Sequence, residues 1–246
     1  MKAIEAKNLS KAYGARQAVD RLNLSVEAGE LLALLGVNGA GKTTTIKMLS
    51  CLTRPTAGDA LVLGRSIAKE PEQVKRSIGV SPQETAIAPN LTARENLEFI
   101  CGIHGYSPKD AKQETAASIE QYGLEEIANR RAKTLSGGWQ RRLSIAMALI
   151  TKPEILFLDE PTLGLDILAR RELWEIIRKL KGKTTVILTT HYLEEAQALS
   201  DRVAILANGR LCALGTVDEL NKLAGKTQFE DTFVALCQGG TQHENG

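Results

Sequence analysis

The chain is poor in features that would place it in several other classes of protein. Its 246 residues include four cysteines, and no two have the close spacing of a zinc site or a disulfide framework: Cys51, Cys101, Cys212 and Cys237. No apolar run approaches the roughly 20 residues needed to span a bilayer, and the first residues lack the apolar core of a signal peptide. We therefore expect a reduced, cytosolic setting, in which any membrane crossing belongs to another chain.

The chain also lacks a clear excess of either positive or negative charge. The 31 lysines and arginines balance 29 acids, so the net charge is only +2. The basic pairs Arg130-Arg131, Arg141-Arg142 and Arg170-Arg171 are scattered, and we interpret them as solvated helix faces. Because a nucleic-acid binder needs a concentrated basic surface, we expect no nucleic-acid partner.

What the sequence does contain is a phosphate-binding pattern. Leu31 to Leu35 are uninterrupted apolar residues, as in a strand buried on both faces of a parallel sheet. Thr44 to Leu52 then indicate a helix, whose positive N-terminal end would face a phosphate bound by the preceding loop. Between them stand two glycines separated by four residues and followed by lysine and threonine: Gly36, Val37, Asn38, Gly39, Ala40, Gly41, Lys42 and Thr43.

Each part of this loop has a chemical task. The glycines let successive amide N–H groups converge on phosphate oxygens. Lys42 adds positive charge for the β- and γ-phosphates, and the Thr43 hydroxyl is suited to ligate Mg²⁺. A glycine-rich turn without a ligand is the alternative, but it leaves the Lys-Thr pair between strand and helix unexplained. We therefore predict that Gly36 to Thr44 bind a nucleoside triphosphate.

A second apolar strand, Ile155 to Leu158, ends in two carboxylates. It would deliver Asp159 to the sheet edge beside the phosphate loop, where Asp159 can hold Mg²⁺ directly or through water. Glu160 would point elsewhere and could orient or deprotonate the attacking water. Two surface acids capping a strand are the alternative. Beside a phosphate loop, the pair favours hydrolysis of the triphosphate.

From about Leu91 to Ile150 the pattern is helical. Leu135-Ser136-Gly137-Gly138 opens one of these helices, where Ser136 and the glycine amides can form a second anion site, although such a segment is most often an ordinary cap. We expect one nucleotide-binding domain over residues 1–236, with a helical subdomain over about 84–150 inserted into an α/β core. A polar tail over residues 237–246 would follow.

Six motifs in order give the chain, from about Ala3 to Leu236, a resemblance to the ATP-binding cassette family. They are Tyr13, the phosphate loop, Gln83, Leu135-Ser136-Gly137-Gly138, Asp159-Glu160 and His191. The resemblance implies a RecA-like phosphate-loop ATPase core with an antiparallel β-region near the N-terminus. It also implies that ATP and Mg²⁺ are bound.

The resemblance assigns further roles. Tyr13 would stack on adenine, although from the residues alone it could equally be a turn tyrosine. Gln83 would sense the Mg²⁺ and water near the γ-phosphate, and His191 would hold that phosphate. Ser136, Gly137 and Gly138 would contact the nucleotide of the opposite protomer, and Leu165-Asp166 would join the two sites across the dimer.

The resemblance also implies a function. Two cassettes, identical or different, would enclose two ATP molecules and drive transport through a separate transmembrane permease at the cytoplasmic side of the cell membrane. The segment Phe229 to Leu236 is similar to the ends of cassettes paired with ABC-2-type export permeases. The alternatives are a soluble cassette ATPase of translation or DNA maintenance, and a GTPase or small-molecule kinase. The first lacks its usual second cassette or coiled-coil insertion here, and neither the GTPase nor the kinase explains Leu135 to Gly138.

Three positions depart from the family pattern. Trp139 stands where glutamine usually follows the two glycines, and Met147 stands at a commonly basic position. Leu163 replaces a small residue. The first two leave the fine contacts of the opposite-protomer site open, and the third those of the linking loop.

Overall fold

Two β-sheets organise the computed structural model, which describes residues 1–239. The smaller sheet is antiparallel, with strand order β2-β1-β4-β5: β1 Lys2–Tyr13, β2 Arg16–Glu27, β4 Ala57–Val62 and β5 Arg65–Ser66. The larger sheet has the order β10-β9-β3-β8-β7-β6: β3 Leu31–Leu35, β6 Ile78–Ser81, β7 Ile155–Asp159, β8 Thr185–Thr190, β9 Arg202–Ala207 and β10 Arg210–Gly215. This arrangement confirms the predicted α/β fold with an antiparallel region.

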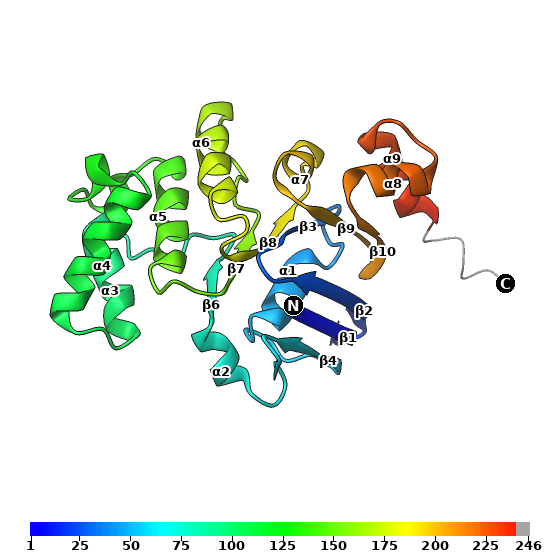
Figure 1. Ribbon diagram of the computed structural model, residues 1–246, viewed down its shortest axis with the longest axis horizontal. Helices are drawn as coiled ribbons and strands as arrows, with labels where there is room; N and C mark the ends of the chain where they lie inside the picture. Colours follow the sequence, from blue (N-terminus) through cyan, green and yellow to red (C-terminus); the bar gives the residue numbers. More distant parts are fainter. Residues whose placement is uncertain (240–246) are drawn as a thin grey trace.

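Helices occupy most of the remaining chain: α1 Lys42–Leu49, α2 Pro71–Arg76, α3 Ala93–Ile103, α4 Pro108–Gln121, α5 Gly137–Leu149, α6 Ile167–Arg178, α7 Leu193–Leu199, α8 Val217–Ala224 and α9 Phe229–Gly239. Two 3₁₀ turns, Glu125–Ile127 and Ala132–Thr134, precede α5. Helices α3, α4 and α5 gather at one end of the molecule, beyond the edge strand β6 (Figure 1). Within the described residues no helix combines the length and the apolar character needed to cross a bilayer.

The strand before the phosphate loop is buried on both faces. Leu32 and Leu34 face a core shared with the antiparallel sheet and α1, while Leu31, Ala33 and Leu35 face a second core built by the helices on the other side. A parallel strand covered on both faces needs an unbroken apolar run. Strands β3, β8 and β7 pair in parallel, so the loops that follow them meet at one edge of the sheet.

The first helix begins two residues before the predicted start at Thr44 and ends three residues before the predicted end at Leu52. It starts at Lys42 because Gly41 is its N-cap, with φ 101°, and it ends at Leu49 because Cys51 takes a left-handed conformation. At the C-terminus, α9 continues to Gly239, and Cys237 packs against the core. The beginning of the predicted tail is therefore helical, and residues 240–246 lie outside the described part of the chain.

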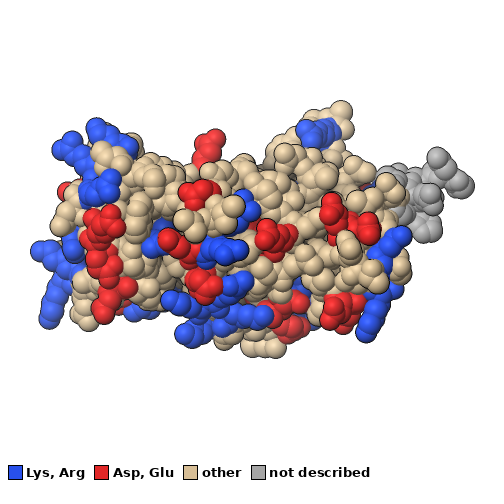
Figure 2. Space-filling view, turned by 90° about the horizontal axis from the view of Figure 1, so that it is seen from above, with Lys and Arg blue, Asp and Glu red and all other residues tan. Residues whose placement is uncertain are grey.

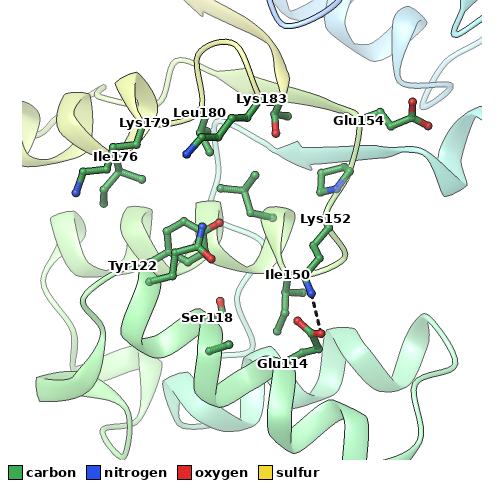
Figure 3. A pocket seen from close by; sticks show the side chains of 15 residues that line it. Glu114, Ser118, Tyr122, Ile150, Lys152, Glu154, Ile176, Lys179, Leu180 and Lys183 are labelled. Atoms are coloured by element: carbon green, nitrogen blue, oxygen red, sulfur yellow. Dashed lines mark hydrogen bonds and ion pairs between the residues drawn. The ribbon is translucent and has the colours of Figure 1, made fainter.

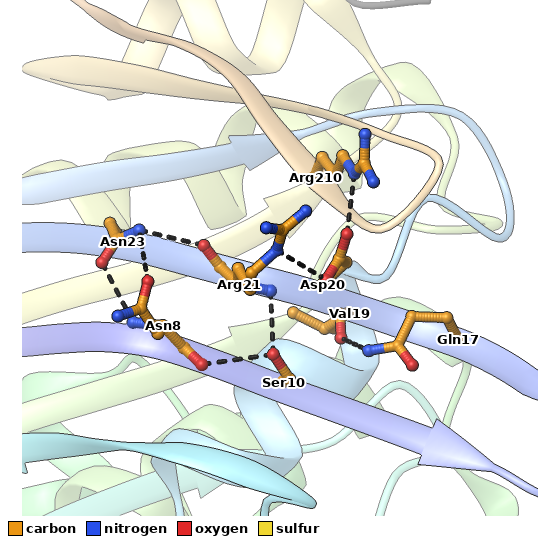
Figure 4. Close-up of polar contacts among 8 residues, drawn as sticks. All are labelled: Asn8, Ser10, Gln17, Val19, Asp20, Arg21, Asn23 and Arg210. Atoms are coloured by element: carbon orange, nitrogen blue, oxygen red, sulfur yellow. Dashed lines mark hydrogen bonds and ion pairs between the residues drawn. The ribbon is translucent and has the colours of Figure 1, made fainter. Parts of the chain in front are cut away.

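A polar cluster fixes the first hairpin against the end of the larger sheet (Figure 4). Asp20 of β2 accepts a hydrogen bond from Arg210 Nε of β10 at 2.8 Å, and its backbone N–H donates to the Gly209 carbonyl at the same distance. Gly209 N–H in turn donates to the Ala40 carbonyl at 3.2 Å. The start of β2 is thus held beside the phosphate loop.

Candidate nucleotide-binding site

The phosphate loop turns from β3 into α1 in a shape that requires glycine. Gly41 has φ 101°, and a Cβ there would lie 2.6 Å from the Ala18 carbonyl oxygen of β2. Both the backbone angle and the available space therefore exclude a side chain. The loop closes over the first turn of α1, where unpaired amide N–H groups can receive an anion.

Lys42 is buried within this loop. Its ammonium donates to the Gly36 carbonyl at 2.8 Å and to the Val37 carbonyl at 3.2 Å. It also lies 3.4 Å from Glu160 Oε1. The positive charge is thus held where the phosphate loop and the acidic strand end meet.

Asp159 lies directly beside the phosphate loop. Its Oδ1 accepts hydrogen bonds from the hydroxyls of Thr43 at 3.0 Å and Thr189 at 2.6 Å. A hydroxyl and a carboxylate are oxygen ligands of the kind that Mg²⁺ prefers, usually with substrate phosphates completing the set. The donors present therefore fit Mg²⁺.

Glu160 occupies an unusual backbone position. It is 8% exposed and has φ 47°, a left-handed conformation that costs on the order of 1–3 kcal/mol in a residue other than glycine. Its N–H donates to Thr189 Oγ1 at 2.9 Å, which supports this conformation. Its Oε2 lies 3.1 Å from His191 Nδ1, so the carboxylate bridges Lys42 and His191.

A cavity of about 690 Å³ brings the predicted segments together, a volume typical of small-molecule sites. Its lining is Tyr13, Arg16, Ala18, Asn38, Gly39, Gly41, Lys42, Thr43, Thr44, Gln83, Glu160, Leu163 and His191. Tyr13, Gln83 and His191 thus join the phosphate loop around one space, above the buried Asp159. Arg16 was not predicted, although a cation three residues after Tyr13 was a usable signal. Thr189 was not predicted because only the fold places it against Asp159.

The Leu135 to Gly138 segment lies elsewhere. Ser136 and Gly137 are exposed, and among residues 1–239 neither lines the nucleotide cavity. Ser136 is the N-cap of α5, yet within the described chain its side chain makes no capping hydrogen bond. A Cβ on Gly137 would meet no described atom within 4 Å, so the packing of this chain does not explain that glycine. Trp139 is half-buried and has the Arg142 guanidinium 4.6 Å from its ring centre.

One predicted surface residue is buried. Arg141 is 5% exposed, and its guanidinium donates to the carbonyls of Pro82 at 2.6 Å and Gln83 at 2.5 Å. Burial lowers the pKa of Arg141, and the charge of Asp159 acts in the opposite direction. The interpretation of Arg141 as part of a solvated face is therefore wrong. This arginine instead ties the Gln83 loop to α5.

A second cavity of about 690 Å³ lies between α4, the end of α5 and the end of α6 (Figure 3). Buried Tyr122 and Leu180 line it, and Lys152 pairs with Glu114 at its rim at 2.8 Å. Neither the phosphate loop nor the acidic end of β7 reaches this cavity. The candidate nucleotide site is therefore the cavity at the phosphate loop.

A phosphate loop between strand and helix, with an acidic strand end beside it, defines a P-loop nucleoside triphosphatase. Residues 19–163 match the ABC transporter family, and the chain belongs to that family. It is 45% identical over 225 residues to the daunorubicin/doxorubicin resistance ATP-binding protein DrrA of Streptomyces peucetius, covering 91% of this chain and 68% of that protein.

Two solved structures resemble the chain closely. An ATP-binding subunit of an ABC transporter has a TM-score of 0.84 and 31% identity, covering 95% of this chain and 99% of that one. A dimeric ATP-binding cassette in a post-hydrolysis state, bound to ADP and Pi, has a TM-score of 0.78 and 28% identity, covering 87% and 98%. The chain is thus an ATP-binding and ATP-hydrolysing cassette.

Proposed function

We propose that this ATPase works as one of two cassettes that power export through a separate membrane-spanning permease. The Glu160 carboxylate, placed between Lys42 and His191 in the cavity wall, is the observation that carries the ATP-driven chemistry. Export is supported by the drug-resistance role in the name of the Streptomyces peucetius relative. The relatives described above favour transport over translation or DNA maintenance.

The proposed chemistry follows from the positions of these side chains. The loop amides and Lys42 bind the phosphates, and Thr43 and Asp159 would hold Mg²⁺, which would neutralise phosphate charge. Glu160 accepts a proton from the attacking water while the oxygen of that water bonds to the γ-phosphorus. The bond from that phosphorus to the bridging oxygen breaks, and ADP leaves. Gln83 and His191 line the same cavity and orient the water and the γ-phosphate.

A second cassette is supported by the face that carries Gly138. A Cβ on Gly138 would lie 3.1 Å from Ala169 Cβ, so the start of α5 packs against the start of α6. Beside this contact Ile167 and Leu168 are 67% and 73% exposed. Neighbouring exposed apolar side chains form a patch of the kind found at interaction surfaces. We assign this face, with Ser136 and Gly137, to the opposite cassette and its nucleotide.

A different surface suits the permease. A hollow of about 160 Å³ between β6, α3 and α5 includes Pro82, next to Gln83. On α3, Phe99 and Ile103 are 54% and 63% exposed. These residues lie in the part of the chain proposed as the helical subdomain, and we place the permease here, on the cytoplasmic side of the membrane. On the face drawn in Figure 2, basic and acidic side chains are interspersed, without a large patch of one sign.

Purification from membranes tests this proposal. The tagged chain, extracted in mild detergent, should carry a multi-spanning protein that mass spectrometry identifies. Phe99→Glu with Ile103→Glu should abolish that association and leave ATP binding intact, because these side chains are outside the nucleotide cavity. Leu223→Glu, an equally exposed apolar position on α8, is the matched control. Absence of any membrane protein, or its retention by the double variant, contradicts the proposed partner or surface.

Tyr13 offers a separate test of the base-stacking role. Tyr13 lines the cavity and is 50% exposed, with the Lys11 ammonium 5.1 Å from the centre of its ring. Tyr13→Ala should weaken ATP binding by about 1 kcal/mol, or roughly fivefold, if an aromatic stack is lost. Tyr13→Phe should keep the affinity, and the preference among metal ions should not change. A fluorescent ATP analogue measures this, and an unchanged affinity in Tyr13→Ala would make Tyr13 a turn residue only.

A further inference from the structure

Helix α7, which follows His191, carries a buried carboxyl that does not line the nucleotide cavity. Glu195 is 0% exposed, and its Oε1 accepts hydrogen bonds from Thr162 Oγ1 at 2.8 Å and Trp174 Nε1 at 3.0 Å. Among the described residues, Oε2 makes no hydrogen bond of good geometry, although the Thr190 hydroxyl also lowers the pKa of the carboxyl. Burial raises the pKa of Glu195, and nearby donors only partly offset this. A carboxyl buried at this cost calls for an explanation.

The two donors to Glu195 Oε1 come from the segments around the hydrolytic residues. Thr162 lies two residues after Glu160, in the loop that leaves β7. Trp174 belongs to α6, the helix that begins immediately after Leu165-Asp166. Glu195 itself lies four residues after His191. One carboxyl oxygen therefore connects the His191 side of the site to the Glu160 side.

A second contact ties the same two segments together. Arg170 of α6 places its guanidinium 4.7 Å from the ring centre of Tyr192, the residue after His191. The Tyr192 N–H donates to Thr190 Oγ1 at 2.9 Å, on the other side of His191. The charge of Arg170 also lowers the pKa of Glu195, though less than burial raises it. The Tyr192 side of the His191 loop is thus in contact with α6.

We propose that Glu195 is a positioning residue, which holds the His191 loop against the segment carrying Glu160 and Asp166 and so maintains the contact between His191 and Glu160. Glu195 acts through His191 and does not itself line the cavity. This inference rests on the proposed roles of His191 and Glu160 in ATP hydrolysis.

Glu195→Leu removes both acceptor oxygens with little change in volume. Measured on the full chain, kcat should fall by about tenfold or more, because a small displacement of catalytic groups is costly. KM for ATP should stay within about threefold, since the cavity lining is unchanged. Glu195→Gln keeps an acceptor oxygen and should restore most of the rate. Glu194→Leu, at the exposed neighbouring position on α7, is the control with an unchanged kcat.

A double-mutant comparison separates positioning from a general effect on folding. In a His191→Ala background, Glu195→Leu should lower kcat by less than about twofold further, because the group through which it acts is gone. A purely structural role would give multiplying losses, a raised KM and no rescue by Glu195→Gln. That pattern overturns the inference.

Two further outcomes are also decisive. If Glu195→Leu does not fold, Thr162→Val tests the same link by removing one donor, and an unchanged kcat in that variant rejects the inference. If His191→Ala hydrolyses ATP at the wild-type rate, the proposed role of His191 fails, and the role of Glu195 fails with it. A slow His191→Ala beside a normal Glu195→Leu rejects the positioning role alone.

Discussion

Glu160→Gln should bind ATP as the unaltered chain does and hydrolyse it about 100-fold more slowly or worse, the loss typical of a missing general base. Glutamine keeps the shape of the side chain and its hydrogen-bonding oxygen, but not the negative charge that polarises water. The structure places that charge between Lys42, at 3.4 Å, and His191, at 3.1 Å. Phosphate release and equilibrium nucleotide binding, measured on the same preparation, separate chemistry from affinity.

The neighbouring acid gives the matched comparison. Asp159 Oδ1 accepts hydrogen bonds from the hydroxyls of Thr43 and Thr189, whereas the Glu160 carboxylate contacts Lys42 and His191. Asp159→Asn should therefore weaken binding of Mg²⁺-ATP itself, whereas Glu160→Gln should not. A Glu160→Gln protein with the wild-type rate rules out Glu160 as the base. Equal losses of affinity in both variants would contradict the separate roles of Asp159 in metal binding and Glu160 in catalysis.

Lys42→Ala should abolish measurable hydrolysis and weaken ATP binding. The lost interaction is a charge-assisted contact with phosphate, commonly about 1.5–3 kcal/mol, so the affinity should fall by roughly tenfold or more. The ammonium is 5% exposed and bound to carbonyls of the loop itself, so no other cation of α1 can take its place.

Lys47 on the same helix provides the control. It is exposed in the last turn of α1, away from the cavity lining. Lys47→Ala should keep both turnover and affinity within about twofold, as expected for a surface position. Isothermal titration and a steady-state ATPase assay check both variants. Wild-type turnover in Lys42→Ala would contradict the assignment of the phosphate loop.

The parts of the site that follow from neighbouring residues were predictable from the sequence. The buried strand Leu31–Leu35 and the loop after it depend on local pattern, and the structure has both. The acidic pair at the end of β7 was predictable for the same reason. Each signal lies within about ten consecutive residues, where backbone geometry and hydrophobic pattern determine the structure.

The parts that depend on distant partners were not predictable. Arg141 looks like half of a surface basic pair until the fold brings the Pro82 and Gln83 carbonyls to its guanidinium. The left-handed backbone of Glu160 is supported by Thr189, which is 29 positions away. Glu194 and Glu195 are identical neighbours in sequence, yet only tertiary packing makes one exposed and the other buried. In each case the deciding contact is long-range.

The measurement that tests the central claim most directly is the oligomeric state of Glu160→Gln with and without nucleotide. In the proposed cycle, ATP favours the closed pair of cassettes and hydrolysis ends it, so a variant that binds without hydrolysing should accumulate as an ATP-bound dimer. Size-exclusion chromatography with light scattering, on the chain alone and on its complex with the proposed permease, should show paired cassettes in Mg²⁺-ATP and unpaired cassettes without nucleotide. Cassettes that stay unpaired in both preparations, or that pair equally without ATP, would contradict the account.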